Sequence, residues 1–391
     1  MRRYLIIAPQ YYPRVGGYAN AVGNLVRALS ESGDVAVTLI TPEPLADAPE
    51  QLLANVEVIR LARYQGRIRY AALIEQIQWV GQLLAHIRGQ SWDLVLFESL
   101  ENPITTFAVL LRLGRKRSGK VAVRIHGTNA MEGFRNSTRT IDRLYWWFVR
   151  RVLLRVRNIT TTTSQYFRFL EETVFFSRIP AAKHLGVVSN IVWPPAPVSD
   201  DEGDTEQIVM LSLGRMNQSG YVQKNFELIP RAVHLLRARR KDIAQNMQIK
   251  IVGDGEMLPK FRKVIEDLKV TEHFELIARL PNEEIRALQQ QVAAVLLVSR
   301  YEGQSMFALE ALAAGAPLIL SRDTGVSDLV AADISNGALV DPLDALDLAD
   351  AMIRLCDADL SELRRASVAH YTAYYRPQKV LRELFDFSDG L

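Results

Sequence analysis

Short apolar runs recur along the whole chain and alternate with segments whose apolar residues repeat at helical spacing. Most runs are continuous rather than alternating, as is typical of strands buried on both faces of a parallel sheet. The predicted strands are residues 4–9, 37–41, 93–99, 121–127, 158–164 and 184–190 in the first half, then 208–214, 248–255, 274–280, 293–299, 316–321 and 337–341 in the second. This alternation of strand and helix predicts right-handed βαβ units.

Between the two series lies PPAPVSDDEGDTEQ (194–207), which is rich in Pro, Asp and Glu and has no apolar periodicity. It is typical of a linker. The pattern therefore predicts an α/β fold with two doubly wound, Rossmann-like domains, residues 1–195 and 206–370. Because ligands of such sheets bind beyond the carboxyl ends of the strands, we expect a site in a cleft between the two facing sheets.

Composition narrows the class of protein. With 391 residues, 48% hydrophobic and 23% charged, the chain is too long for one ordinary core and too apolar to be disordered. No apolar run approaches the ~20 residues of a membrane span, and MRRYLIIAPQ reads as a first strand rather than a signal peptide. One cysteine, Cys356, excludes a disulfide framework and a cysteine zinc site, which favours a cytoplasmic protein.

The net charge of +3 conceals an asymmetry between the halves. Residues 1–195 hold 25 Lys and Arg against 14 Asp and Glu, whereas residues 196–391 hold 22 against 30. A basic first half suggests an anionic partner, which could be nucleic acid, a membrane surface or a phosphorylated acceptor.

The segment RYEGQSMFALEALAAGAP (300–317) places two glutamates, Glu302 and Glu310, around a helix start. Ser305 is expected as the N-cap and Gly315 as the glycine that ends the helix. A helix N-terminus suits a phosphate, and Glu310 has the reach to bind a ribose hydroxyl pair. Each glutamate alone is equally compatible with an ordinary exposed carboxylate.

Two cations follow the first strand of the second half. Arg215 comes directly after IVMLSLG, and Lys224 follows after the polar loop NQSGYVQ. A guanidinium and an ammonium are a common pair for neutralising a diphosphate. Exposed loop cations remain the alternative.

The first half offers Gly16 and Gly17 between a strand and a helix, and His126 at the end of VAVRIHG. The paired glycines allow the backbone to approach a ligand closely. His126 could bind a polar ligand or serve the structure alone. Neither a GxGxxG fingerprint nor a Walker A motif occurs.

Taken together, YPRVGG, HG at 126–127, LGRMN with Lys224, VGDGE at 252–256 and EGQSMFALEALAAGAP resemble the retaining GT-B glycosyltransferases of family 4, glycosyl transferases group 1. The resemblance runs nearly end to end and keeps the family's motif order. It implies the GT-B fold, with the last helix, about 371–391, packing back on the first domain.

The resemblance also implies roles. Arg215 and Lys224 would hold the donor's diphosphate, Glu302 would contact hydroxyls of the donor sugar, and Glu310 would bind the ribose. His126 would hydrogen-bond the donor sugar near the reacting carbon.

The remaining implied contacts are with the nucleotide and its phosphates. Arg279 would lie near the base, and Gly253 belongs to the VGDGE motif. Gly303, Gln304 and Ser305 would present backbone or side-chain groups to the sugar and phosphate. Gly16 and Gly17 would line the cleft against the diphosphate and the acceptor. The family's usual GF after the first glutamate is GQS here, and its NG(V/I)D is SNIVWPP, which bears on sugar and acceptor specificity.

The implied reaction moves a sugar from a nucleoside-diphosphate sugar to an acceptor hydroxyl with retention. No metal or other cofactor is expected, because cations and a helix start can stabilise the leaving diphosphate. The DxD triplet Asp357–Asp359 reads better as a helix start. The base, sugar, acceptor and oligomeric state are not readable from the sequence.

The stretch 134–158 combines arginines with Tyr145, Trp146, Trp147 and Phe148. It fits an interfacial helix on an anionic membrane and a core helix with exposed arginines equally well. The first interpretation implies a lipid-linked acceptor at the inner membrane face and a role in bacterial cell-surface polysaccharide or glycolipid assembly.

Two other functions stay open. A GT-B sugar-nucleotide epimerase would share the donor site, and a basic Rossmann-like protein could bind nucleic acid without being an enzyme. The acidic second half and the paired glutamates argue against nucleic acid.

Overall fold

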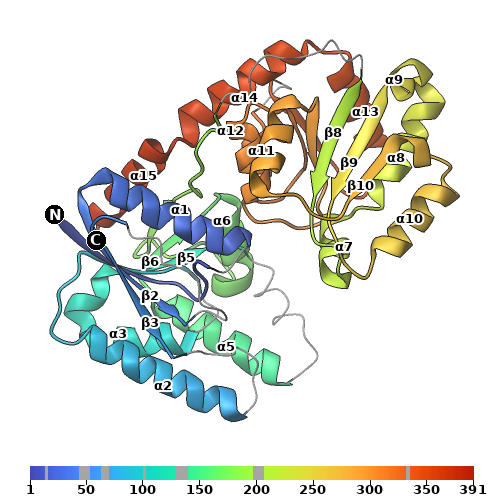
Figure 1. The fold of residues 1–391 in the computed structure, drawn as a ribbon. Helices are drawn as coiled ribbons and strands as arrows, with labels where there is room; N and C mark the ends of the chain where they lie inside the picture. Colours follow the sequence, from blue (N-terminus) through green and yellow to red (C-terminus); the bar gives the residue numbers. More distant parts are fainter. Residues whose placement is uncertain are drawn as a thin grey trace. The chain divides into compact units, whose positions relative to one another are not determined.

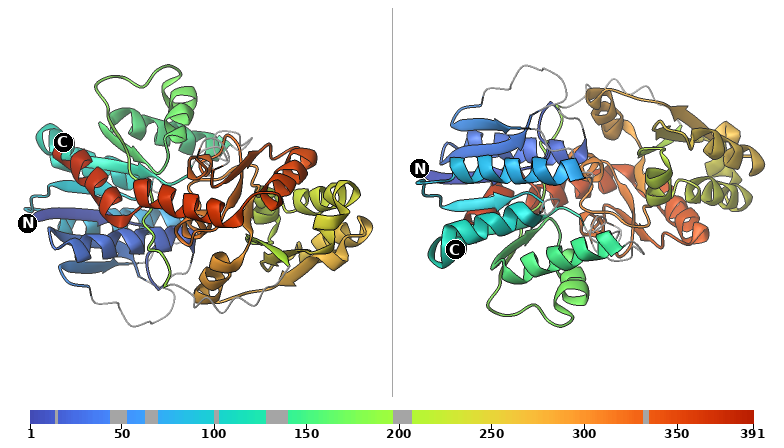
Figure 2. Two further views of the ribbon diagram at one scale, coloured as in Figure 1. Left: turned by 90° about the horizontal axis from the view of Figure 1, so that it is seen from above. Right: turned by 90° about the horizontal axis from the view of Figure 1, so that it is seen from below.

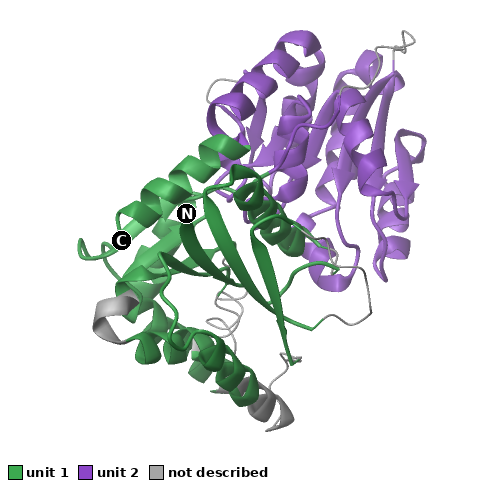
Figure 3. Cartoon of the chain, turned by 60° about the vertical axis from the view of Figure 1, so that its left-hand side comes forward, with its two compact units in different colours: residues 1–191, 377–391 green, residues 192–376 purple. Residues whose placement is uncertain are grey.

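The computed structural model describes residues 1–13, 16–43, 53–62, 70–99, 103–127, 140–196, 207–331 and 335–391. The chain divides into unit 1, residues 1–191 with 377–391, and unit 2, residues 192–376 (Figure 3). Sequence patterning had placed the domains at 1–195 and 206–370. Each unit holds its own parallel sheet and its own apolar core, so the predicted α/β class with two doubly wound domains is confirmed.

In the described part of unit 1, seven strands pair in the order β3-β2-β1-β4-β5-β6-β7, and every pairing is parallel. The strands are β1 (Arg2–Ile7), β2 (Val35–Pro42), β3 (Val56–Leu61), β4 (Leu94–Phe97), β5 (Val121–Ile125), β6 (Asn158–Thr161) and β7 (His184–Val187). The helices are α1 (Gly17–Ser32), α2 (Tyr70–His86), α3 (Pro103–Arg117), α5 (Thr140–Arg155), α6 (Gln165–Leu170), which runs into a π-helical turn (Glu171–Phe175), and α15 (Pro377–Asp389).

Alternate residues of β1 show why these strands are apolar throughout. Leu5 and Ile7 belong to the core beneath α2, α3, α5 and α6, whereas the hydroxyl of Tyr4 shares a hydrogen bond with the hydroxyl of Ser388, in α15, on the other face. Figure 1 and Figure 2 show helices on both faces of this sheet. Both faces are buried, so a continuous apolar run is favoured over an alternating one.

Unit 2 repeats the arrangement with the order β10-β9-β8-β11-β12-β13, again all parallel. Its strands are β8 (Ile208–Leu213), β9 (Met247–Val252), β10 (Phe274–Ile277), β11 (Ala294–Leu297), β12 (Leu318–Ser321) and β13 (Gly337–Val340). Its helices are α7 (Gln218–Lys224), α8 (Leu228–Arg239), α9 (Lys241–Gln245), α10 (Leu258–Asp267), α11 (Asn282–Gln291), α12 (Met306–Ala313), α13 (Ala345–Cys356) and α14 (Leu360–Tyr374).

Several helices in unit 2 begin at residues that accept backbone N–H groups. Ser305 caps α12, as predicted, and Asp359 caps α14 through Ser361 and Glu362. The DxD triplet is therefore a helix start, and its other aspartate, Asp357, pairs with Arg240. At the C-terminus of α12, Gly315 has φ +79°, the left-handed conformation that glycine adopts most readily.

Three details differ from the predicted elements. β3 was not predicted, because two charged residues, Glu57 and Arg60, interrupt its apolar run VEVIRL at the sheet edge. The predicted loop between Arg215 and Lys224 is largely the helix α7, which Asn217 caps through the N–H of Gly220. Several strands end before their predicted last residues, as β4 does before Glu98 and β5 before His126, because the chain leaves the sheet at those polar residues.

Most of the predicted linker, residues 197–206, lies outside the described residues. Across the part of the chain that the structure covers, none of the helices has the length and apolar character required to cross a bilayer.

Candidate functional site

The order of the strands identifies the edge where a ligand binds. In each sheet the order reverses next to the first strand, between β1 and β4 in unit 1 and between β8 and β11 in unit 2. Doubly wound sheets bind ligands beyond the carboxyl ends of the strands at this reversal. The predicted site residues lie in segments that follow these strands or their neighbours in the sheet, and each unit is described here in turn.

In unit 2, Lys224 and Glu302 form a tight ion pair. Lys224 is the last residue of α7, and its Nζ lies 2.5 Å from Oε2 of Glu302, in the loop after β11. Ser299 donates its hydroxyl to the same carboxylate oxygen at 3.1 Å. The two charged side chains are only 17% and 11% exposed. The structure thus brings together two residues that lie 78 positions apart in sequence.

Arg215 follows β8 in the same unit and is exposed. It forms no ion pair or side-chain hydrogen bond with the described residues. Its backbone carbonyl lies 2.5 Å from the position of a Cβ added at Gly220, so the start of α7 packs directly on Arg215. An exposed guanidinium and a half-buried ammonium at the two ends of the same short segment are suited to an anionic ligand.

At this edge, the loops after the strands pack closely against one another at glycine residues. A Cβ at Gly253, after β9, would lie 2.1 Å from the carbonyl oxygen of Gly214, after β8. A Cβ at Gly325 would lie 2.9 Å from the backbone of Gly303, and the Gly325 N–H donates to the Glu302 carbonyl at 2.9 Å. The loops that carry Arg215 and Glu302 are therefore fixed by backbone contacts that any side chain would disrupt.

The helix α12 begins in the loop that carries Glu302. Gln304 and Ser305 are buried, and the Ser305 hydroxyl accepts from the N–H of Ala308. Glu310 lies further along α12, 18% exposed, and its carboxylate pairs with Arg286 of α11 at 3.4 Å. Burial raises the pKa of Glu310, and the Arg286 guanidinium offsets this in part.

Arg279 makes no hydrogen bond or ion pair with Lys224 or Glu302. Its side chain is 87% exposed after β10, and its nearest carboxylate is that of Asp254, 3.9 Å away. The implied contact of Arg279 with a base stays a prediction.

In unit 1, His126 lies beside two residues that sequence reasoning did not select, Glu98 and Arg124. Nε2 of His126 is 2.5 Å from Oε2 of Glu98, which follows β4 and is fully buried. Arg124, within β5, is 1% exposed, and its guanidinium lies 3.5 Å from the same oxygen. A charged residue inside the apolar run VAVRI was the available signal, because a buried charge requires a partner.

The charge states follow from this packing. Although burial acts to raise the pKa of Glu98, Arg124 and His126 hold it below its usual range. Burial lowers the pKa of His126, and Arg124 adds to the effect, while Glu98 and Asn190 oppose it. At neutral pH the carboxylate is therefore charged and the imidazole neutral.

Gly16 and Gly17 mark the start of α1, at the same edge of unit 1. Gly16 has φ +156° and ψ +158°, and α1 has no side-chain cap at its N-terminus. Both glycines are exposed. Within α1, Tyr18 packs its ring edge-on to His126, with the ring centroids 5.0 Å apart, and donates its hydroxyl to the Glu98 carbonyl.

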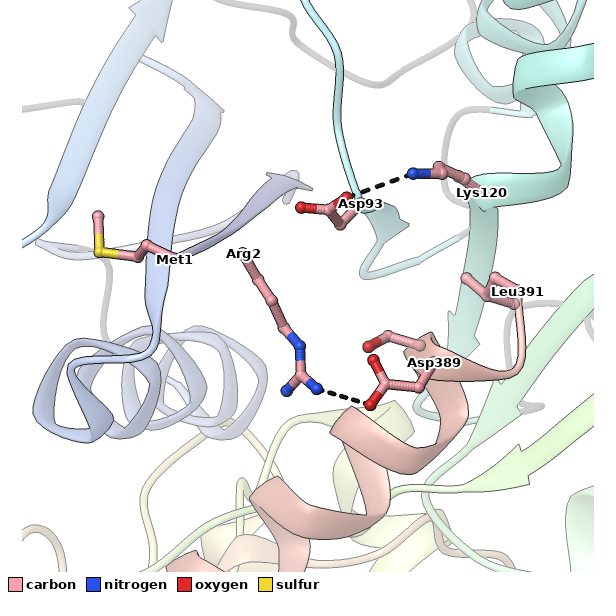
Figure 4. A pocket seen from close by; sticks show the side chains of 7 residues that line it. Met1, Arg2, Asp93, Lys120, Asp389 and Leu391 are labelled. Carbon is pink, nitrogen blue, oxygen red and sulfur yellow. Dashed lines mark hydrogen bonds and ion pairs between the residues drawn. The ribbon is translucent and has the colours of Figure 1, made fainter.

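Neither a metal centre nor a second ligand site is evident elsewhere in the described residues. No cluster of His, Cys, Asp and Glu among the described residues has the arrangement of a metal centre. A pocket of about 430 Å³ is lined by Met1, Arg2, Asp93, Lys120, Ser388, Asp389 and Leu391 (Figure 4). It lies at the amino ends of β1, β4 and β5, opposite the ligand edge, and its cations pair with Asp389 and Asp93.

Each of the two units matches a family model of glycosyltransferases. The family model "Glycosyl transferases group 1" matches residues 200–370, and the model "Glycosyl transferase 4-like domain" matches residues 16–184. The MMP alpha-(1->4)-mannosyltransferase of Mycolicibacterium hassiacum is 32% identical over 133 residues, which cover 34% of this chain and only 32% of that protein.

Two further matches extend over the whole chain. The GDP-mannose:cellobiosyl-diphosphopolyprenol alpha-mannosyltransferase of Xanthomonas oryzae is 24% identical over 98% of this chain and 96% of its own length. The structure of sucrose-phosphate synthase from Thermosynechococcus elongatus superposes with a TM-score of 0.76 at 17% identity, covering 100% of this chain and 99% of that one. The latter similarity supports the GT-B fold.

Proposed function

Because the chain belongs to the glycosyl transferases group 1 family and has the GT-B fold, we propose that it transfers a sugar from a nucleoside-diphosphate sugar to an acceptor hydroxyl. The observation that carries this proposal is the Lys224–Glu302 ion pair where the strand order of unit 2 reverses, with the exposed Arg215 in the loop that follows β8. An enzyme of this class must stabilise a departing diphosphate, and these cations supply positive charge at the edge where such ligands bind.

In this proposal the ion pair changes partners when the donor arrives. Lys224 binds the diphosphate together with Arg215, and Glu302 accepts hydrogen bonds from sugar hydroxyls. Ser299 keeps the Glu302 carboxylate oriented in the meantime. Glu310, half-buried on α12, binds the ribose, and the N-terminus of α12 contributes backbone N–H groups.

The proposed reaction proceeds with retention and without a metal. Loss of one preorganised donor to a leaving group commonly costs about 3 kcal/mol of transition-state stabilisation, so two cations can replace a metal's contribution. Adding a chelator is expected to leave the rate unchanged, whereas dependence on a divalent cation would contradict this part of the proposal.

GDP-mannose and a lipid-linked diphosphate acceptor are the substrates to test first. Both appear in the name of the Xanthomonas oryzae relative, which matches nearly the whole chain, and a second relative is also a mannosyltransferase. The proposed setting is cell-surface polysaccharide or glycolipid assembly at the inner face of the membrane.

The outer face of α5 supports such a setting. Leu144 and Trp147 are 62% and 53% exposed, and Arg151 stacks on the Trp147 ring at 4.9 Å. An exposed stripe of apolar, aromatic and arginine side chains suits an anionic lipid surface. Leu144→Glu/Trp147→Glu is expected to reduce sedimentation with phosphatidylglycerol vesicles, and Leu343→Glu, a matched exposed leucine in unit 2, is not.

The decisive experiment measures thermal stabilisation by UDP, GDP and ADP. A ligand at one hundred times its Kd stabilises the folded state by about 2.7 kcal/mol, which shifts Tm measurably. We expect one nucleotide to raise Tm in the wild type and in Lys263→Ala/Arg365→Ala, two exposed cations of unit 2. The shift is expected to vanish in Arg215→Ala/Lys224→Ala.

Absence of a shift with every nucleotide would contradict the proposal. Salt-dependent binding to DNA in its place would support the nucleic-acid alternative. An epimerase would bind the nucleotide but convert the sugar without transferring it, so product analysis with and without acceptor separates the two enzymes.

A further inference from the structure

We infer that Glu98 is a positioning residue that holds His126 as the neutral tautomer with its hydrogen on Nε2. Nδ1 is then the nitrogen that His126 offers as a hydrogen-bond acceptor. The use of this acceptor in sugar transfer rests on the function proposed above, whereas the tautomer is a property of unit 1 alone.

The contact between the two side chains selects the tautomer. Oε2 of Glu98 lies 2.5 Å from Nε2 of His126, and the Glu98 side chain has no exposed surface. An ionised carboxylate has only acceptors, so the nitrogen that faces it must carry the hydrogen. This is the arrangement by which a buried carboxylate fixes the ring of a histidine in other enzymes.

Arg124 keeps Glu98 ionised in this dry position. Its guanidinium lies 3.5 Å from Oε2 of Glu98 and also donates to the carbonyls of Val188 and Ser189, at 2.9 and 2.6 Å. The carboxylate therefore has a fully buried counter-charge that is itself anchored to the loop after β7. Arg124 and His126 together lower the pKa of Glu98 despite its burial.

Burial, with the nearby charge of Arg124, keeps the imidazole neutral by lowering its pKa, and its neighbours hold it oriented. Glu98 and Arg124 are the charged groups that act on it among the described residues, and Asn190 contributes a side-chain hydrogen bond, which like Glu98 raises the pKa. Tyr18 of α1 packs against the ring, and the hydroxyl of Tyr166, in α6, donates to the His126 carbonyl at 3.3 Å. With one hydrogen on the ring and that hydrogen on Nε2, the lone pair lies on Nδ1.

This state limits what His126 does toward a ligand. A neutral ring with an Nδ1 lone pair accepts a hydrogen bond from a hydroxyl and donates none at that atom. Protonation at acid pH would place a hydrogen on Nδ1 and abolish the acceptor. Glu98 thereby determines the polarity of a hydrogen bond to a ligand that it does not itself touch.

The test combines nuclear magnetic resonance with kinetics. In protein labelled with ¹⁵N-histidine, the two-bond ¹H–¹⁵N spectrum distinguishes the tautomers, and His126→Gln identifies the His126 signals among those of the six histidines. We expect the Nε2–H tautomer in the wild type at pH 7.5. Glu98→Asp keeps acceptor-only chemistry and is expected to retain this tautomer. Glu98→Gln adds an amide donor that can face Nε2, so the Nδ1–H form is expected to appear.

The kinetic arm uses the donor identified by thermal shift. We expect Glu98→Gln to lower kcat/KM at least about tenfold, as loss of an orienting partner typically does. Glu98→Asp should recover part of the loss, and Glu57→Gln, a carboxylate of β3, should have no effect. Because Glu98 raises the pKa of His126, its removal should also move the acid limb of the pH profile to lower pH.

Each outcome decides the inference. An Nδ1–H or doubly protonated ring in the wild type overturns it, as does a Glu98→Gln variant with an unchanged tautomer. Unchanged kcat/KM in Glu98→Gln with an altered tautomer removes the role in transfer. If the wild type transfers no sugar from any donor, the proposed function fails, and the spectra still decide the tautomer.

Discussion

Among the described residues, the most deeply buried Glu and Arg side chains pair with each other. Glu98 and Arg124 have almost no exposed surface and pair with each other, and the half-buried Lys224 pairs with Glu302. An unpaired buried charge would cost several kcal/mol, so each of these side chains depends on a specific partner. Both pairs lie near the point of each sheet where the strand order reverses. The buried charges are therefore part of the candidate site.

Gly253 is expected to tolerate no side chain. An added Cβ would lie 2.1 Å from the Gly214 carbonyl, so Gly253→Ala must push apart the loops after β8 and β9. We expect it to lower the free energy of unfolding by about 1–3 kcal/mol and to weaken nucleotide binding. The measurements are urea denaturation and the nucleotide-induced Tm shift.

Gly81→Ala is the matched control, since Gly81 lies in α2 with no atom within 4 Å of the added Cβ. This variant should stabilise the helix by about 1 kcal/mol. Equal effects of the two substitutions would contradict the packing described for the loops after β8 and β9.

Mild acid is expected to destabilise unit 1 through His126. Its folded pKa lies below the usual value, so the unfolded chain binds the proton first and stability falls as the pH drops below about 6.5. Glu98 has a lowered folded pKa, so its contribution is present above its usual pKa and is lost at lower pH, as the pH falls through the folded value.

Thermal unfolding between pH 7.5 and 5.5 tests whether stability falls with pH as predicted. The wild-type Tm should fall over this range, and His126→Gln, which cannot titrate, should show a smaller slope. A slope as steep in the variant would mean that other groups cause the acid sensitivity.

Among the elements, the C-terminus of α5 is capped by a lysine side chain from another part of unit 1. Nζ of Lys183 donates to the carbonyls of Leu153, Leu154 and Val156 at 3.0, 2.8 and 2.5 Å. Leu153 and Leu154 lie in the last turn of α5 and Val156 directly follows it, where helix carbonyls lack partners within the helix. A cation at this end also interacts favourably with the helix dipole.

Replacing Lys183 should therefore loosen the end of α5. Lys183→Met keeps the apolar stem but removes three donors, and we expect a loss of about 1–3 kcal/mol in the free energy of unfolding. Urea denaturation measures this loss. Lys263→Met, which removes an exposed lysine paired one turn away with Asp267, is the control and should change stability by less than about 0.5 kcal/mol. A similar small effect at Lys183 would argue against the cap.

The elements also show where sequence patterns are sufficient. Buried central strands such as β1, β8 and β11 were predicted because burial on both faces imposes an apolar run. β3 was missed because this edge strand is only partly buried and carries two charged residues, Glu57 and Arg60, so it has no continuous apolar run. Ser305 and Asp359 were predictable as caps because a cap depends on local geometry, whereas the short helix α7 in a polar, glycine-containing segment has no apolar periodicity to reveal it.

At the scale of the whole molecule, unit 1 is completed by the last segment of the chain. The α15 helix packs on β7 and α1 in the structure (Figure 1). Its Phe387 ring lies 4.5 Å from the His184 ring and occupies the space left by Gly186. Unit 1 is thus built from both ends of the sequence.

Phe387→Ala is expected to destabilise unit 1 without disturbing unit 2. Removing a buried phenylalanine typically costs about 3–5 kcal/mol, so the unfolding transition of unit 1 should move to lower temperature in calorimetry. The Tm shift produced by the nucleotide should persist, because the side chains predicted to bind its diphosphate and ribose, Arg215, Lys224 and Glu310, belong to unit 2. Val368→Ala, a half-exposed residue of α14, is the control, and loss of the nucleotide effect in Phe387→Ala would contradict this separation.

The sequence by itself determined the α/β class, the existence of two domains and most of the proposed donor residues. Those features depend on local periodicity, on helix caps and on motifs whose residues lie close together in the chain. Only the tertiary structure showed that Lys224 meets Glu302 and that Glu98 and Arg124 surround His126. These contacts join strands that are adjacent in the sheet but distant in sequence, so their partners follow from strand order and not from local pattern.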